Sequence, residues 1–222
     1  MKIQDIQRVV CLCCDQRKDN IEYIKSISKI FNINIELFIA GNGKDTTIKY
    51  DYIDRMSKYE SINDCQKIIL RQAMIDGLDN ILILEDDITF TKDFIETLSL
   101  IEIPENWDSI ALGAYSNFDE YGIYPEYDDR IVYLLKPERI SGFFGIIIHK
   151  NVFRLLTESH ISIMMDNILS NNHCNQYVLS RPIIIERPLI SAANGIKSNK
   201  PIYNQAKEDG RIFTDKEIKF HR

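Results

Sequence analysis

Glu85, Asp86 and Asp87 form an acidic triplet directly after the four consecutive apolar residues 81–84. Such an apolar run is typical of a strand that is buried on both faces of a parallel sheet. Ligands of open α/β sheets bind outside the carboxyl ends of these strands. Adjacent carboxylates repel one another unless a cation is present, and their oxygens suit Mg²⁺ or Mn²⁺. The triplet therefore predicts a divalent-metal site for a phosphorylated ligand, while a solvated acidic turn is the competing interpretation.

Two cationic side chains are candidates for binding the phosphates of such a ligand. Arg17 follows the first predicted strand, residues 9–14, at the same expected edge of the sheet. A guanidinium there can bind a phosphate through two parallel hydrogen bonds. Lys44 follows a turn in which Gly41 and Gly43 allow a close backbone approach. A surface arginine and an ordinary turn are the alternatives that these residue types leave open.

The elements that must position these side chains alternate along the first half of the chain. Apolar runs predict strands at 9–14, 35–40 and 80–84, and helical spacing and capping residues predict helices at 19–30, from 61 or 63 to 76, and 91–100. The second half mixes predicted strands at 109–114, 143–148, 177–179 and 183–185 with short helices at 151–156 and 164–169. We expect one compact α/β domain over 1–198, with a nucleotide-binding half (1–100) and an acceptor-binding half (101–198). A mobile polar tail is expected over 199–222.

The amino-acid composition limits the classes of protein to which the chain can belong. The chain has 222 residues, 45% of them hydrophobic, which is enough for one domain with a real core. Its net charge of -6 argues against a nucleic-acid partner, which would require a basic surface. A nucleotide ligand remains compatible with this charge, because a metal ion can offset its phosphates.

The five cysteines favour a reducing compartment. Three of them lie together in the first predicted strand, where neighbouring side chains point to opposite faces, and none forms a spaced metal-binding pair. An odd number of unspaced cysteines is typical of buried, reduced thiols. The first residues do not resemble a secretory signal, and no apolar run approaches the length of a membrane span. We therefore expect a cytoplasmic protein without a transmembrane segment.

Several motifs, in this order, resemble those of GT-A glycosyltransferases, most closely the family-twenty-five type of lipopolysaccharide-biosynthesis and collagen galactosyltransferases. The resemblance covers residues 9–198. Its best match is the helix ending at 73–79 followed by the strand and acidic triplet of 81–87. The segments 15–19, 38–45, 141–148 and 164–169 are similar to the family's basic loop, second strand, glycine-flanked strand and short Asp-bearing helix. Gln66 and Lys67 stand where the family often has a Ser-His pair.

The resemblance implies a GT-A-like Rossmann-type mixed sheet and a role for each candidate. It implies that Asp87 binds Mn²⁺ or Mg²⁺, that Asp86 is a second metal ligand or orients the site, and that Glu85 contacts the ribose or the water around the metal. Asp166, placed between apolar residues on its short helix, is implied to be the base of an inverting transfer. Arg17, Gly43, Lys44, Glu85 and Asp86 would contact a nucleotide-sugar donor, such as a UDP-sugar. The acceptor would be a hydroxyl group of a glycan, a lipid-linked sugar or a protein.

Two other classes compete with this interpretation. Nucleotidyltransferases and dehalogenase-like phosphatases also place acids after a buried strand. Asp15 has the position of a phosphatase nucleophile, but Arg17 stands where that class has a second Asp, and 15–20 lacks the glycines of a nucleotidyltransferase loop. The third interpretation is a non-catalytic sugar-nucleotide-binding domain, whose affinity need not depend on metal.

A few further residues carry weaker expectations. Lys67 is expected on a solvated helix face, and Gly142 and Gly145 are expected either to leave space for a sugar or to ease packing. The tyrosines of 115–127 are interpreted as a sugar-stacking wall or as a self-packed loop. Among the histidines, His173 and His221 are weak candidates for a further metal ligand.

Overall fold

Seven strands of the described chain form one mixed sheet, in the order β2-β1-β3-β7-β5-β8-β6. The computed structural model describes residues 2–40, 55–116, 134–137, 140–188, 201–214 and 217–218. The strands of this sheet are β1 (Val9–Cys14), β2 (Glu36–Ala40), β3 (Asn80–Glu85), β5 (Ser109–Ser116), β6 (Leu134–Leu135), β7 (Ile140–His149) and β8 (Gln176–Leu179). A second, two-stranded sheet consists of β4 (Ile88–Phe90) and β9 (Ile184–Glu186).

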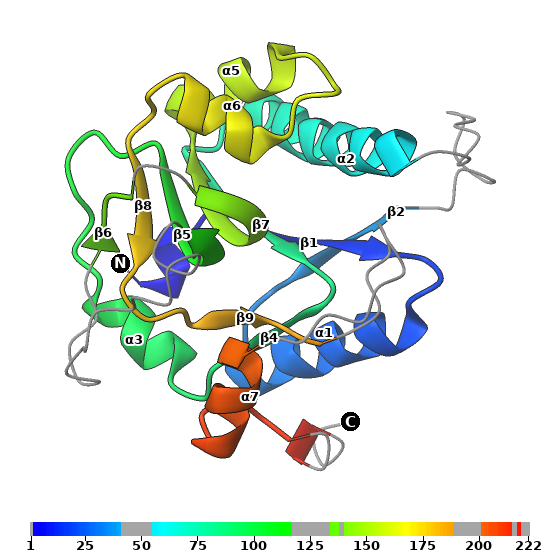
Figure 1. Ribbon diagram of the computed structural model, residues 1–222, viewed down its shortest axis with the longest axis vertical. Helices are drawn as coiled ribbons and strands as arrows, with labels where there is room; N and C mark the ends of the chain where they lie inside the picture. The colour runs from blue at the N-terminus through cyan, green and yellow to red at the C-terminus, as the bar shows by residue number, and fades with distance from the viewer. Residues whose placement is uncertain are drawn as a thin grey trace.

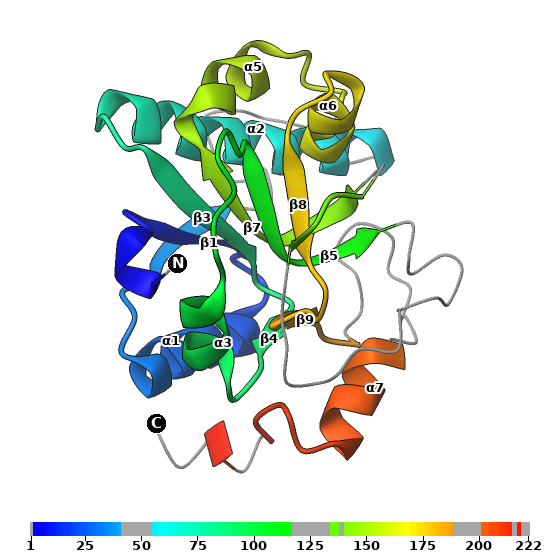
Figure 2. The same ribbon diagram turned by 90° about the vertical axis from the view of Figure 1, so that its left-hand side faces the viewer.

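Helices cover both faces of the large sheet (Figures 1 and 2). One face carries α2 (Arg55–Ile75), α5 (Phe153–Glu158) and α6 (Met165–Asn171). The other face carries α1 (Lys18–Phe31), α3 (Phe94–Leu100), the β4–β9 sheet and α7 (Pro201–Glu208). Two short 3₁₀ helices, η1 (Ile3–Asp5) and η2 (Lys150–Val152), precede β1 and α5. The expected mixed α/β sheet flanked by helices in one compact domain is therefore confirmed.

The strand directions bring several chain segments to one edge of the sheet. β1 is parallel to β2 and β3, whereas β7 is antiparallel to β3, with Leu84 opposite Gly145. The carboxyl ends of β1, β2 and β3 therefore lie beside the amino end of β7. We call this side of the sheet the carboxyl edge and the opposite side the amino edge. The acidic triplet lies at the carboxyl edge, because β3 ends at Glu85.

Alternation along the central strands builds a core on each face. Cys11 and Leu84 belong to the cluster beneath α1 and α3, whereas Val10 and Ile83 belong to the cluster beneath α2, α5 and α6. Each of these four residues is at most 5% exposed. This two-sided burial is why β1 and β3 read as nearly continuous apolar runs in the sequence. Because β3, β7 and β5 are adjacent, both predicted halves of the chain contribute to a single sheet.

The predicted helices are present in the structure, but their ends differ from the predicted ones. α2 begins at Arg55, earlier than the predicted start at 61 or 63, and ends before Gly77, whose φ of 69° suits the left-handed turn there. The predicted helix at 91–100 is partly wrong: α3 begins at Phe94, and the N–H of Thr91, directly after β4, donates to Ile183 O instead of lying in a helix.

The expectation of a polar tail over 199–222 is wrong for its described part. Residues 201–208 form α7, and Ala206, Ile212 and Ile218 are each at most 2% exposed. Ile212 pairs with Thr91 through an isolated bridge, and Glu217 forms an ion pair of 2.8 Å with Lys92. Widely spaced apolar residues give little periodic signal, yet Ala206 and Ile212 cluster with Ile185 of β9, and Ile218 joins the core cluster beneath α1 and α3.

None of the described helices combines the length and the apolar composition that crossing a bilayer requires.

Candidate functional site at the carboxyl edge

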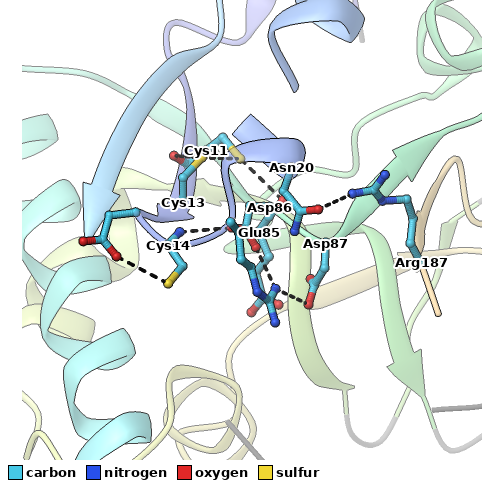
Figure 3. Close-up of polar contacts among 10 residues, drawn as sticks. Cys11, Cys13, Cys14, Asn20, Glu85, Asp86, Asp87 and Arg187 are labelled. Atoms are coloured by element: carbon cyan, nitrogen blue, oxygen red, sulfur yellow. Dashed lines mark hydrogen bonds and ion pairs between the residues drawn. The ribbon is translucent and has the colours of Figure 1, made fainter. Parts of the chain in front are cut away.

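The acidic triplet lies where β3 turns into β4, between the end of β1 and Arg187 (Figure 3). Asp86 is buried, and Glu85 and Asp87 are half-buried. Their backbone position follows from the sequence, since Leu12 of β1 pairs with Glu85 and fixes the end of β3 beside the end of β1. The competing interpretation of a solvated acidic turn is therefore wrong for these residues.

Both carboxylate oxygens of Asp86 accept hydrogen bonds from the segment after β1. Oδ2 accepts from the backbone N–H of Cys14 at 3.0 Å, and Oδ1 accepts from Arg17 Nη1 at 3.0 Å. Burial raises the pKa of Asp86, while the Cys14 hydrogen bond and the charge of Arg17 act in the opposite direction. Asp86 thus joins β3 to β1, and its oxygens have less capacity for a metal ion than the resemblance implies.

Asp87 keeps one oxygen without a partner. Its Oδ2 accepts from Arg17 Nη1 at 3.1 Å, whereas its Oδ1 is buried and has no hydrogen-bond partner within the described part of the chain. An unsatisfied buried carboxylate oxygen is costly, and such groups usually mark the place of an ion, a water or a ligand. Asp87 is therefore the member of the triplet best placed to bind a cation.

Arg17 connects the two aspartates. It is the residue before α1, and its backbone N–H donates to Cys14 O at 2.9 Å, which closes the turn after β1. Burial acts to lower the pKa of Arg17, but the negative charges of Asp86 and Asp87 outweigh burial and raise it. The predicted location of Arg17 at the edge beside the triplet is confirmed, and its contact with a phosphate stays a prediction.

Glu85 has an environment that favours its neutral form. Burial raises the pKa of its carboxyl well above the ordinary range, and the nearby charges of Asp87, Glu186 and Asp86 raise it further. Glu186 ends β9, and it is brought to the site by its pairing with Ile88. The site therefore carries four acidic groups, one more than the triplet indicates.

Arg187, which follows β9, is a site residue that the sequence did not reveal. Its backbone N–H donates to Asp87 O at 2.7 Å, and its Nη2 donates to Asn20 Oδ1 at 2.6 Å. The guanidinium lies over the ring of Tyr23, with 4.1 Å between its carbon and the ring centroid. A short strand that ends in Glu-Arg at 186–187 was the available signal, but nothing local indicated that this strand pairs with β4.

Asp166 reaches the same edge from the other face of the sheet. Its Oδ2 accepts from the backbone N–H of Gly142 at 3.2 Å, and its Oδ1 accepts from its neighbour Asn167 at 2.7 Å. Gly142 has a φ of 74° and lies three residues before Gly145, the partner of Leu84. The register therefore places Gly142, and Asp166 with it, beyond the end of β3. Each oxygen of Asp166 retains a lone pair that can accept a proton.

Side chains of α2 hold the segment before α6. Asn63 is fully buried, and its Nδ2 donates to Ile161 O and Ile163 O, both at 2.6 Å. Lys67 is only 3% exposed, and its Nζ donates to Ser159 O. The expectation that Lys67 lies on a solvated face is wrong, because α5 and the following turn pack against this face of α2. Burial lowers the pKa of Lys67.

The remaining candidates are resolved only in part. Gly43 and Lys44 lie outside the described residues, as do His221 and the tyrosines at 121, 124 and 127. A Cβ on Gly145 would lie 2.7 Å from the side chain of Ile184, so this glycine permits packing against β9. His173, with a φ of 53°, follows α6 as part of a turn.

The site can supply part of the coordination shell of a cation. No group of three or more His, Cys, Asp or Glu side chains within the described ranges is arranged to hold a metal ion. The free Oδ1 of Asp87 nevertheless fits a hard cation whose other ligands come from water and from a diphosphate. The residues therefore fit a metal held jointly with a ligand, with Asp87 as its protein anchor.

The solved structures that resemble this chain include two distant ones. No protein-family model matches the chain, and no curated protein matches it. A197 from STIV is 13% identical, with a TM-score of 0.45, over 80% of this chain and 83% of that chain. A glycosyltransferase involved in the glycosylation of the major capsid of PBCV-1 is 12% identical, with a TM-score of 0.37, over 67% of this chain and 63% of that chain. The structural neighbours thus include a glycosyltransferase, and at this level of similarity the functional argument rests on the site itself.

Proposed function

We propose that the protein is a metal-dependent glycosyltransferase that moves a hexose from a nucleotide sugar, such as a UDP-sugar, to a hydroxyl acceptor. The observation that carries the proposal is the pairing of Arg17 with Asp87, together with the placement of Asp166 at the same carboxyl edge by its contact with Gly142 of β7. An anchor for a cation, a guanidinium and a potential base are the groups that transfer from a sugar diphosphate requires.

The leaving diphosphate would be bound beside Asp87. A divalent ion, Mn²⁺ or Mg²⁺, would stabilise the negative charge that develops on the diphosphate. Arg17 would donate hydrogen bonds to the same phosphates, and Asp86 would hold the turn after β1 through Cys14. Glu85 would contact the ribose or the water around the metal, and Gly43 and Lys44 stay predicted donor contacts.

Asp166 would remove the proton from the acceptor hydroxyl. Its carboxylate is held by the backbone of Gly142, at the amino end of β7. A base on this side of the sheet would let the acceptor attack from the face opposite the diphosphate, which gives inversion at the sugar carbon. The acceptor belongs to a glycan, a lipid-linked sugar or a protein, in keeping with a role in lipopolysaccharide or other glycan biosynthesis.

The proposal is tested by the binding and slow hydrolysis of a panel of UDP-sugars. Wild-type protein, Asp87→Ala and the control Asp76→Ala are each assayed with Mn²⁺ and with EDTA. Asp76 is a suitable control because it also pairs with an arginine, but at the amino edge. We expect metal-dependent binding of one UDP-sugar that Asp87→Ala weakens by about a hundredfold and Asp76→Ala leaves unchanged.

Two results would contradict the proposal. Full binding in EDTA without turnover would indicate a non-catalytic sugar-nucleotide-binding domain. Failure of every UDP-sugar to bind would favour another nucleotide or the phosphatase class.

A further inference from the structure

A single nitrogen atom of Arg17 lies between the two aspartates of the site. Nη1 is 3.0 Å from Asp86 Oδ1 and 3.1 Å from Asp87 Oδ2. The side chains are largely withdrawn from water, with exposed fractions of 17% for Arg17, 7% for Asp86 and 14% for Asp87. Ion pairs that are shielded from water interact much more strongly than exposed ones. The guanidinium is therefore firmly held at the position where the two carboxylates converge.

A divalent ion on the same oxygens would collide with this nitrogen. Mg²⁺ binds carboxylate oxygens at about 2.0–2.1 Å, so an ion that bridges the two aspartates would lie close to Nη1. The positive charges of the ion and of the guanidinium would also repel each other at this distance. The two cations therefore cannot both occupy the space between Asp86 Oδ1 and Asp87 Oδ2.

We infer that Arg17 and a divalent cation compete for these carboxylates, and that the diphosphate of a nucleotide resolves the competition by taking the Arg17 guanidinium. The inference rests on the proposed function, because it assigns the diphosphate of the donor as the anion. Phosphate oxygens accept the forked donors of arginine as well as carboxylates do. Metal and nucleotide then bind with positive coupling, and each raises the affinity of the other by the same factor.

The remaining contacts of the site are compatible with this exchange. Arg17 is fixed by its backbone N–H on Cys14 O, so its side chain can change partners while the turn after β1 stays in place. Asp86 keeps the hydrogen bond from the Cys14 N–H when Arg17 leaves. The ion gains the Oδ1 of Asp87, which has no partner within the described residues. Since the described side chains supply no three-residue metal group, oxygens of the diphosphate complete the shell.

Free Mn²⁺, measured by electron paramagnetic resonance during titration, tests the inference with and without UDP. The wild type is expected to bind Mn²⁺ weakly alone and about tenfold or more tightly with UDP, the range of ordinary coupling energies. Arg17→Met is expected to bind Mn²⁺ alone about tenfold more tightly than the wild type, because a positive charge has been removed from the site. Its UDP effect should be smaller than that of the wild type, because relief of the Arg17 competition no longer contributes to the coupling. The matched control is Arg8→Met, since Arg8 bridges Glu36 and Asp76 at the amino edge, and it should behave as the wild type.

The outcomes separate this inference from the proposed function. Equal Mn²⁺ affinity in Arg17→Met and the wild type would overturn the competition, whether or not sugar transfer is observed. Tighter Mn²⁺ binding by Arg17→Met without a UDP effect in either protein would support the competition and refute a UDP donor. Wild-type protein that binds Mn²⁺ equally with and without UDP would overturn the coupling, and this measurement needs no variant to fold.

Discussion

The two ends of β1 carry arginines that make the same kind of contact in different surroundings. Arg8, at the amino edge, bridges Glu36 at 3.0 Å and Asp76 at 2.6 Å, and the acidic side chains are 44% and 35% exposed. Arg17, at the carboxyl edge, bridges Asp86 and Asp87, which are 7% and 14% exposed. Exposed pairs contribute little to stability, whereas burying charges carries a large desolvation penalty. Burial and neighbouring charges raise the pKa of Glu85, and Asp87 Oδ1 has no partner in the described part of the chain. Such an arrangement is better explained by ligand binding than by stability.

The largest expected effect tests whether Asp166 belongs to the carboxyl-edge site. Asp166→Asn should lower the transfer rate by about 10²–10⁴-fold, the usual contribution of a general base. Donor binding should persist, because Asp166 contacts β7 rather than the acidic triplet. Single-turnover transfer and donor titration measure the two effects separately. Asp108→Asn is the matched control, since Asp108 also accepts from a backbone N–H, that of Asn175, at the amino edge. Equal rates in both variants would remove Asp166 from the mechanism.

A second prediction concerns the support that α2 gives to this edge. Asn63→Leu should lower the free energy of unfolding by about 2 kcal/mol, because it leaves Ile161 O and Ile163 O without their donor. Denaturant titration measures this loss. Hydrogen exchange should also accelerate over 159–167. Glu60→Ala is the control, because its hydrogen bond with Ser162 is exposed and should matter much less. Unchanged exchange in this segment would show that α2 does not position Asp166.

Glu85→Gln tests whether the carboxyl edge is destabilised by its own charge. The pKa of Glu85 in the folded protein is raised above its ordinary value of 4.5, chiefly by burial. The folded protein therefore binds this proton more tightly than the unfolded chain. The carboxyl group favours folding most at low pH, and this contribution is lost as the pH rises through the folded-state pKa.

Glu85→Gln should consequently be more stable than the wild type at neutral pH, by on the order of 1 kcal/mol. The difference should shrink as the pH falls below the folded-state pKa. Denaturant titrations at several pH values measure it, and Glu36→Gln serves as the control at the amino edge. A stability difference that does not depend on pH would show that the charge of the Glu85 carboxylate does not destabilise the folded protein.

The smallest effect is expected at the amino edge. Arg8→Met should cost less than about 1 kcal/mol of stability, as for other partly exposed ion pairs, and the cost should diminish in high salt. Donor binding should not change. Thermal unfolding at two salt concentrations tests the first expectation. A loss of donor binding would mean that the two edges are not functionally distinct.

Much of the central sheet was predictable because its signal is local. The apolar runs of β1 and β3 reveal two-sided burial, and the helical spacing of α1 matches its predicted range within one residue at each end. The position of the acidic triplet at the end of β3 follows from the same run. The β4–β9 sheet was missed, because pairing of Ile88 with Glu186 joins segments almost a hundred residues apart. The packing of 201–214 and the burial of Lys67 were missed for the same reason, since neither depends on a periodic pattern.

The sequence by itself determined which acids stand at the end of a buried strand and that Arg17 follows the neighbouring strand, because burial pattern and chain order are encoded locally. Tertiary structure alone decided the rest of the site. It placed Glu186 and Arg187 beside the triplet, satisfied both oxygens of Asp86 and left one oxygen of Asp87 without a partner among the residues that the structure describes. These outcomes depend on distances between side chains of separate elements, and such distances exist only once the strands have paired.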